Sequence, residues 1–245
     1  MQLRRVLIIA FVFVMLGPAS LAQPEPAPPE PIQLATARLP SVVDMPLYFR
    51  LYRVHLPAAK RSWYRGSNAM LYGLSGTAVV EIDAVSRPLA PGAGVFIAAG
   101  QGAMLSAPAS EAAELLLFVL TARPNQRWVM SDRVAVTREV FRTGEPLPGL
   151  RFGTYDFTLA RVTVPAGAPA TPPHYRTGAA LDYVLAGSAA VIAGDKTEAT
   201  PVGAPLFERY GWVHRLANPG NGPLVLLQAN INREGEPPVH VVSEK

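Results

Sequence analysis

The chain of 245 residues contains no cysteine, which removes several kinds of chemistry at once. Disulfide bonds, thiol nucleophiles and thiolate metal ligands are all excluded. Histidine is scarce as well, with four in the whole chain, so an imidazole site has very few positions to draw on. The sequence also lacks a glycine-rich phosphate loop, the Gly-x-Ser-x-Gly motif of serine hydrolases and paired histidines on a helix.

Concentrated charge is another thing that the sequence lacks. The formal charge of +4 falls to +2 without residues 1–22, because Arg4 and Arg5 lie there and no acid does. No run of basic residues is present in the remainder. Nucleic-acid binding therefore has no electrostatic footprint, and we expect no nucleic-acid partner.

The N-terminus has the pattern of a secretory signal peptide over residues 1–22. Basic MQLRR is followed by the apolar run LIIAFVFVML, which is too short to span a bilayer comfortably, and then by the small residues of GPASLA. We expect cleavage before Gln23 and export to the periplasm or the medium, with no membrane contact afterwards; an uncleaved anchor is the alternative. Residues 23–40, which begin QPEPAPPEP, are interpreted as a Pro-rich linker.

The rest of the chain contains an internal repeat. Residues 63–104 and 174–215 are identical at 12 of 42 positions without a gap, in a register that aligns Trp63 with His174. The preceding segments, YFRLYRVHLPA and DFTLARVTVPA, match as well, in a slightly different register because the second copy has extra residues just before His174. A match sustained over such a length in one register indicates duplication of a structural unit.

Each copy consists of short β-type runs separated by glycine and proline, which favours an all-β sandwich or barrel. We predict two tandem barrels that pack as a pseudo-dimer, and further self-association is open. The predicted boundaries are an N-terminal barrel over 41–124, a connecting segment over 125–150, a C-terminal barrel over 151–236 and a tail over 237–245. A short helix or strand in the connecting segment is expected to pack on both barrels.

Two blocks of the repeat resemble the two motifs of the cupin superfamily. Gly167, His174 and Gly187 fall at or near positions of the first motif, Gly-x5-His-x-His-x3–4-Glu-x6-Gly. The second motif, Gly-x5-Pro-x-Gly-x2-His-x3-Asn, is matched in spacing by the set Gly203, Gly211, His214 and Asn218, with Arg209 in place of its proline. The resemblance covers almost the whole chain after the linker and implies two jelly-roll barrels, each with a ligand site in its mouth.

In metal-binding cupins, two histidines and a glutamate of the first motif and a histidine of the second hold one divalent metal. The corresponding residues of the C-terminal copy are His174, Arg176, Ala180 and His214. In the N-terminal copy they are Trp63, Arg65, Ala69 and Ala103. The resemblance therefore implies no metal site in the first barrel and half of one in the second, for Fe, Zn, Mn, Ni or Cu.

The remaining polar residues leave two readings of the C-terminal barrel open. Asp182 should face inward like Ala180 and could be a third metal ligand, or it could form an ion pair with Arg176 that replaces the metal. Trp212 beside His214, and Gln228 in the last predicted strand, are expected to line the pocket with Arg176 and Asp182. Glu208 is interpreted only as a wall residue.

Three functions follow from these readings. The first is an exported bicupin that binds a small molecule, anionic if Arg176 reaches it, in the C-terminal barrel without a full metal site. The second is a metal-dependent enzyme of oxygenase or isomerase type that uses His174 and His214. The third is a structural or protein-interaction module, which a barrel filled by its own side chains would favour.

Overall fold

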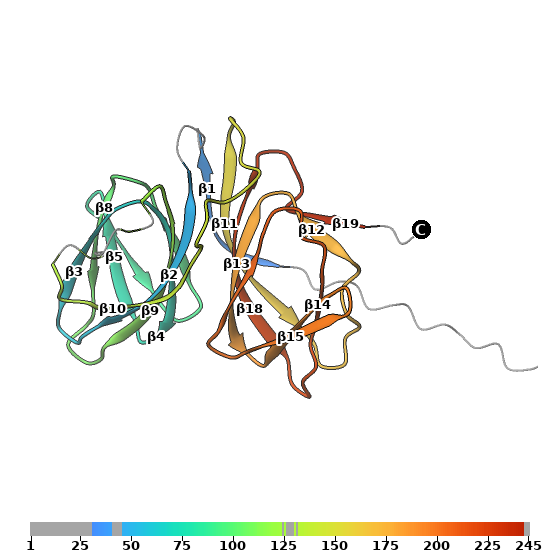
Figure 1. Ribbon diagram of the computed structural model, residues 1–245. Helices are drawn as coiled ribbons and strands as arrows, with labels where there is room; N and C mark the ends of the chain where they lie inside the picture. The colour runs from blue at the N-terminus through green and yellow to red at the C-terminus, as the bar shows by residue number, and fades with distance from the viewer. Residues whose placement is uncertain (1–30, 41–45, 124, 126–129, 131, 243–245) are drawn as a thin grey trace, which may run out of the picture.

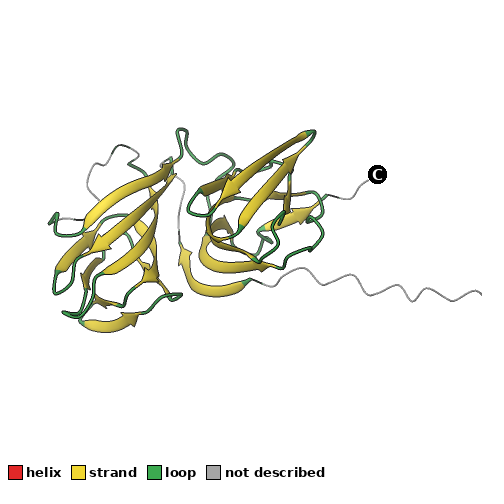
Figure 2. Cartoon of the chain, turned by 90° about the horizontal axis from the view of Figure 1, so that it is seen from below, coloured by secondary structure: helices red, strands yellow, loops and turns green. Residues whose placement is uncertain are grey.

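The structure, a computed structural model, describes residues 31–40, 46–123, 125, 130 and 132–242. These residues form strands and turns and contain no helix, so the all-β prediction is confirmed. Two barrels lie side by side in Figure 1, and the view from below in Figure 2 shows the same pair. The predicted signal peptide, residues 1–22, lies outside the described residues.

A search of the described residues for a helix long and apolar enough to cross a membrane finds none.

The N-terminal barrel is built from two antiparallel sheets. The larger has the order β10-β2-β9-β4-β7 and the smaller the order β3-β8-β5-β6. The larger sheet contains β2 (Tyr48–Leu56), β4 (Asn68–Ser75), β7 (Gly94–Ile97), β9 (Ala113–Thr121) and β10 (Val136–Arg142). The smaller sheet contains β3 (Arg61–Arg65), β5 (Ala78–Ile82), β6 (Val85–Leu89) and β8 (Gly102–Ser106).

The C-terminal barrel repeats this plan with a divided second sheet. Its large sheet has the order β1-β11-β18-β13-β16, and the two small sheets have the orders β15-β14-β17 and β12-β19. The large sheet contains β1 (Ile32–Leu39), β11 (Tyr155–Val164), β13 (Ala179–Ala186), β16 (Pro205–Glu208) and β18 (Leu224–Arg233). The small sheets contain β12 (His174–Arg176), β14 (Ser188–Ala193), β15 (Lys196–Pro201), β17 (Arg215–Ala217) and β19 (Val239–Val241).

The strands repeat in the registers found in the sequence. β4 and β7 begin and end at the residues that the repeat aligns with the ends of β13 and β16. β9 and β18 begin at the aligned residues Ala113 and Leu224, and β2 and β11 end at the aligned residues Leu56 and Val164. The repeat in sequence is thus a repeat in structure, and equivalent positions of the two barrels can be compared directly.

One strand of each large sheet comes from outside the predicted barrel. β1 pairs with β11 of the C-terminal barrel, although residues 23–40 were predicted to be a linker. β10, from the predicted connecting segment, pairs with β2 of the N-terminal barrel. The linker prediction is wrong for Ile32–Leu39, because the proline-rich run ends at Pro31 and the β-compatible run IQLATARL follows before the next proline, Pro40. The N-terminal barrel therefore contains β2 to β10, the C-terminal barrel contains β11 to β19 together with β1, and the chain crosses between them twice.

The predicted tail also contains a strand. β19 pairs with β12, with Val241 opposite His174 and Val239 opposite Arg176. His240 stacks on Tyr175, with ring centroids 5.5 Å apart. The segment after residue 236 therefore covers the strand that carries His174.

Buried apolar side chains form three clusters, which the strand alternation separates. One fills the N-terminal barrel and a smaller one lies in the C-terminal barrel. The third joins the facing sides of the two large sheets, where Phe49 contacts Phe157 at 6.2 Å between ring centroids. Along β18 the odd-numbered Leu227, Ala229 and Ile231 belong to this junction. The even-numbered residues of β18 face the barrel interior.

The glycine that closes the first motif is required by the backbone. Gly187 has φ +75°, and a Cβ there would lie 2.8 Å from the carbonyl oxygen of Pro223. Its repeat equivalent Gly76 has φ +64° and is crowded in the same way by the start of β9. A side chain at either position would strain the turn and push the next strand away.

Candidate metal centre

The two histidines of the C-terminal motifs face each other across a backbone bridge. The amide of each donates to the carbonyl of the other, with both N···O distances 2.9 Å. The bridge is antiparallel and holds the imidazole rings with centroids 4.5 Å apart. Both side chains are buried. His174 and His214, which come from separate motifs of the sequence, are thus brought to one point inside the barrel.

Each imidazole is oriented by a backbone carbonyl. His174 Nδ1 lies 2.9 Å from the carbonyl oxygen of Pro172, and His214 Nδ1 lies 3.0 Å from that of Trp212. A carbonyl can only accept, so we assign the proton of each neutral ring to Nδ1, which leaves Nε2 with a free lone pair. Burial lowers the pKa of His174 and favours this neutral form. A backbone hydrogen bond on the second nitrogen is the usual support of a metal-ligating histidine.

Glu208 supplies a carboxylate to the same point. It is the last residue of β16, its side chain is buried, and its Oε2 lies 3.2 Å from His214 Nε2. One ligand atom from each of His174, Glu208 and His214 lies within 4.8 Å of the others. Within the described residues this is the only such group of three. The carboxylate that Asp182 was expected to provide thus comes from Glu208.

Strand pairing explains why Glu208 takes this position. Glu208 lies directly opposite Ala180, the position at which the cupin motif has its glutamate. In the N-terminal barrel the equivalent pair is Ile97 opposite Ala69. The carboxylate therefore comes from the strand beside the one on which the cupin motif has its glutamate. The sequence did contain a signal for this role: Glu208 aligns in the repeat with Ile97, a residue that the alternation of the strand places in the core.

Arg176 pairs with Glu208 and not with Asp182, as one reading had expected. Its Nε donates to Glu208 Oε2 at 2.5 Å, and both side chains are buried. Burial opposes charge on both groups, but their mutual attraction prevails. It raises the pKa of Arg176 and, with the contact to His214, lowers the pKa of Glu208 well below its usual range. The single positive charge of Arg176 is thus already balanced within the barrel.

Asp182 lies beside this cluster, on β13 opposite Gln228 and Leu206. It is fully buried, and neither carboxylate oxygen has a well-formed hydrogen bond within the described residues. Burial, and next the nearby charge of Glu208, raise the pKa of Asp182 well above its usual range. Burial thus favours the protonated form of Asp182.

The wall above Asp182 is polar. The inward residues of β18 continue from Gln228 to Asn230 and Asn232, all of them buried. The Asn230 amide donates to Gln228 Oε1 at 3.1 Å, while Asn230 Oδ1 has no partner among the described residues. The equivalent residues of the N-terminal barrel are Leu117, Val119 and Thr121, so two of the three polar residues of this wall have apolar equivalents there.

Trp212 covers the outer side of His214. The indole and imidazole rings are stacked, with centroids 4.5 Å apart and planes at 18°. The Arg209 guanidinium also lies over Trp212, 5.8 Å from the ring centroid. Trp212 was expected to line the pocket with Arg176 and Asp182; in the structure its nearest site partner is His214.

The donor set fits a divalent metal. His214 Nε2 is buried and has no hydrogen-bond partner among the described residues, yet it lies 3.2 Å from a carboxylate oxygen. In the assigned tautomer both atoms are acceptors, so only a cation or an added proton can make their approach favourable. Two imidazoles and one carboxylate are a common ligand set for zinc, ferrous iron and related ions.

Comparison with known proteins agrees with the architecture. No protein-family model matches the sequence, and no curated protein matches it. A variant of oxalate decarboxylase from Bacillus subtilis superposes with a TM-score of 0.55 and 14% identity, over 84% of this chain and 79% of that one. AerE from Microcystis aeruginosa superposes with a TM-score of 0.54 and 18% identity, over 83% of this chain and 97% of that one.

At such identities the similarity establishes the fold and nothing further. The chain has the cupin fold in two tandem barrels, as the motifs predicted. Its second barrel contains a histidine, glutamate and histidine cluster that could hold a metal.

Proposed function

We propose that the chain is an exported, metal-dependent bicupin enzyme whose C-terminal barrel holds one divalent ion through His174, Glu208 and His214. The observation that carries the proposal is His214 Nε2, buried without a hydrogen bond among the described residues and 3.2 Å from the Glu208 carboxylate. Buried polar atoms without a hydrogen-bond partner are rare in proteins and destabilise the fold, so a bound ligand would explain His214 Nε2. Export rests on the signal-like residues 1–22 alone.

The substrate class that this site favours is a small polar molecule with oxygen donors. A bound divalent ion would supply Lewis-acid or redox chemistry. The chain's own contribution is the polar wall of Gln228 and Asn230, which offers amide groups to the substrate, and the pair of Arg176 with Glu208, which orients the carboxylate. Small carboxylic acids are the first compounds to assay, since oxalate decarboxylase, a protein of the same fold, is named for one of them.

A metal-free binding protein is the second candidate, supported by the Arg176–Glu208 ion pair. In that case Arg176 would replace the metal's charge, as one reading of the sequence had it. Glu208 balances that charge, however, so Arg176 leaves no excess positive charge that would attract an anion. The geometry therefore favours the metal.

Metal content tests the choice between the two candidates. Protein purified from Gln23 without chelators or a histidine tag should contain about one equivalent of a divalent metal by mass spectrometry. His214→Ala and Glu208→Gln should each lower this content by at least tenfold, since loss of one of three ligands removes a large part of the binding energy.

His55→Gln is the matched control for the loss of an imidazole. His55 lies on β2 of the other barrel, where its Nδ1 contacts Glu114 at 2.7 Å. Its loss should leave the metal content unchanged. Wild-type protein that stays metal-free after incubation with each candidate ion would overturn the proposal and leave the metal-free candidate.

A further inference from the structure

A cavity lies outside the C-terminal barrel, at the junction with the N-terminal one. Its volume is about 550 Å³, within the range of small-molecule sites. One wall is the end of β10 and the loop after it, from Phe141 to Pro148; the other comes from Phe207, Arg209 and Trp212. The cavity therefore lies where the chain leaves β10 of the first barrel and passes to the second.

The walls combine flat apolar surfaces with cationic groups. Phe141 and Phe207 lie with ring centroids 5.7 Å apart and tilted planes. Trp212 adds a third ring, so aromatic surface dominates the floor. A flat aromatic ligand gains most from such a floor, because offset and edge-on ring contacts add to the area that it buries.

The two arginines that line the cavity differ in whether a carboxylate already neutralises them. Arg142 Nη2 is bonded to Glu139 at 2.8 Å, and Glu145 is the one acid in the lining. Arg209 is exposed, lies over Trp212, and has no carboxylate partner within the described residues. A guanidinium held over an indole keeps its edge free for a carboxylate.

We infer that this cavity is a binding site for a flat aromatic carboxylate, with the ring against Phe141, Phe207 and Trp212 and the carboxylate on Arg209. The site is distinct from the histidine cluster, because Trp212 separates the two. Phe207 and Glu208 are neighbours on β16 and face opposite sides of the sheet. The inference does not depend on a metal.

The test is calorimetric titration of metal-stripped protein with 2-naphthoate near neutral pH, with neutral 2-naphthol beside it. Naphthoate should bind with one-to-one stoichiometry, at least about fivefold more tightly than naphthol. Arg209→Gln should weaken naphthoate by roughly five- to tenfold and leave naphthol unchanged, since one exposed charge-assisted contact is lost. Arg61→Gln, an exposed arginine of β3 outside the cavity, is the charge control.

A filling variant tests the location without disturbing the core. Gly144 lines the cavity, does not have a positive φ, and a Cβ there would meet no atom within 4 Å. Gly144→Phe should therefore fold normally and abolish binding of both probes. Gly222→Phe is the matched control, because Gly222 is equally open and lies outside the cavity. Glu208→Gln should leave binding unchanged.

The inference has clear ways to fail. It is overturned if wild-type protein shows no saturable naphthoate binding, or if folded Gly144→Phe binds as well as wild type. Equal affinities for naphthoate and naphthol would overturn the assignment of an anionic ligand. None of these outcomes bears on the metal content, so this inference and the proposed function fail independently.

Discussion

Two buried carboxyl groups in the C-terminal barrel have opposite surroundings. Glu208 accepts a hydrogen bond from Arg176 at 2.5 Å, and this pairing lowers the pKa of Glu208 well below its usual range. Asp182, on the neighbouring strand, has no well-formed hydrogen bond among the described residues, and burial raises its pKa well above the usual range. Glu208 can therefore act as a metal ligand, while Asp182 is a buried polar group that lowers the stability of the fold.

Asp182→Leu should stabilise the metal-free protein, because it restores the residue of the first copy, Leu71, and removes an unsatisfied buried carboxyl. We expect the free energy of unfolding in urea to rise by about 1–3 kcal/mol. The reverse change, Leu71→Asp, should lower it by about 3–5 kcal/mol, since it buries a carboxyl in an apolar core. A folded Asp182→Leu variant that is less stable than wild type would show that Asp182 contributes favourable contacts.

At the scale of elements, the sequence predicts what depends on local pattern and misses what depends on pairing between distant strands. The repeat register and the resemblance to the two cupin motifs located the barrels, His174 and His214. The role of Glu208 was missed because it depends on β16 lying beside β13, which places Glu208 opposite Ala180. The place of β1 was missed for the same reason, since nothing in IQLATARL says which barrel it joins.

Asp132 holds the connecting segment to β3, the edge strand of the smaller N-terminal sheet, by hydrogen bonds. Its carboxylate accepts hydrogen bonds from Ser62 Oγ at 2.6 Å, the Trp63 amide at 2.7 Å and the Val134 amide at 3.1 Å. Burial would raise the pKa of Asp132, but these hydrogen bonds outweigh it and lower the pKa. We expect Asp132→Ala to reduce the free energy of unfolding by about 1 kcal/mol at neutral pH.

The effect of Asp132 should depend on pH in a definite direction. Since the pKa is lower in the folded chain than in the unfolded one, the unfolded chain takes up the proton first as the pH falls. The stabilisation is therefore present above the unfolded pKa, near 4, and is lost as the pH falls through the folded value. Melting temperatures of wild type and Asp132→Ala should converge in acid; a difference that stays constant with pH would contradict this.

At the scale of the whole molecule, β1 makes the two barrels parts of one folding unit, because it precedes the N-terminal barrel in the chain and pairs with β11 of the C-terminal barrel. β10, from the segment that connects the barrels, is the edge strand of the other large sheet. The junction between the sheets is itself a core, with Phe157 of β11 within 6.3 Å of the rings of Phe49 and Phe96. A fragment cut at the predicted boundaries 41–124 or 151–236 would lose a strand and expose this surface, and an open sheet edge favours aggregation.

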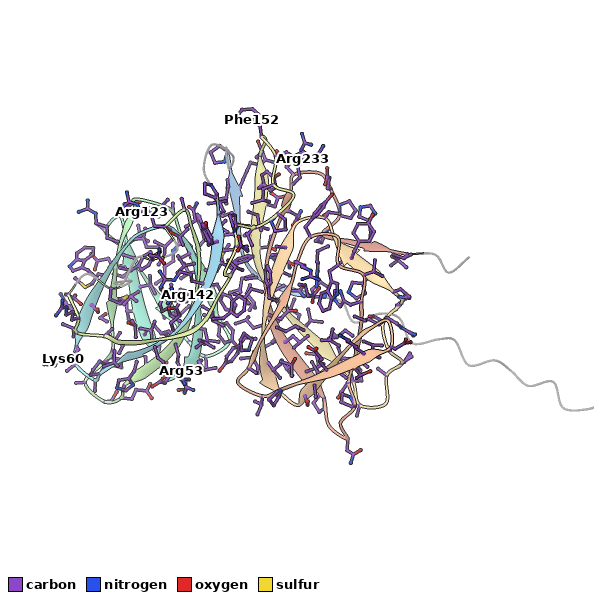
Figure 3. All side chains as sticks on the ribbon, viewed as in Figure 1. Arg53, Lys60, Arg123, Arg142, Phe152 and Arg233 are labelled. Atoms are coloured by element: carbon purple, nitrogen blue, oxygen red, sulfur yellow. The ribbon has the colours of Figure 1, made fainter. Side chains whose placement is uncertain are left out.

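The chain from Gln23 should therefore unfold in one calorimetric transition, with calorimetric and van't Hoff enthalpies nearly equal. Phe157→Ala should lower the free energy of unfolding by about 3–5 kcal/mol and shift the whole transition without splitting it, because the cavity that it leaves lies between the barrels. Phe152→Ala is the control, since Phe152 projects from one end of the molecule and is 73% exposed (Figure 3). Two separate transitions in wild-type protein, of which Phe157→Ala moves only one, would show that the barrels fold independently despite the core between them.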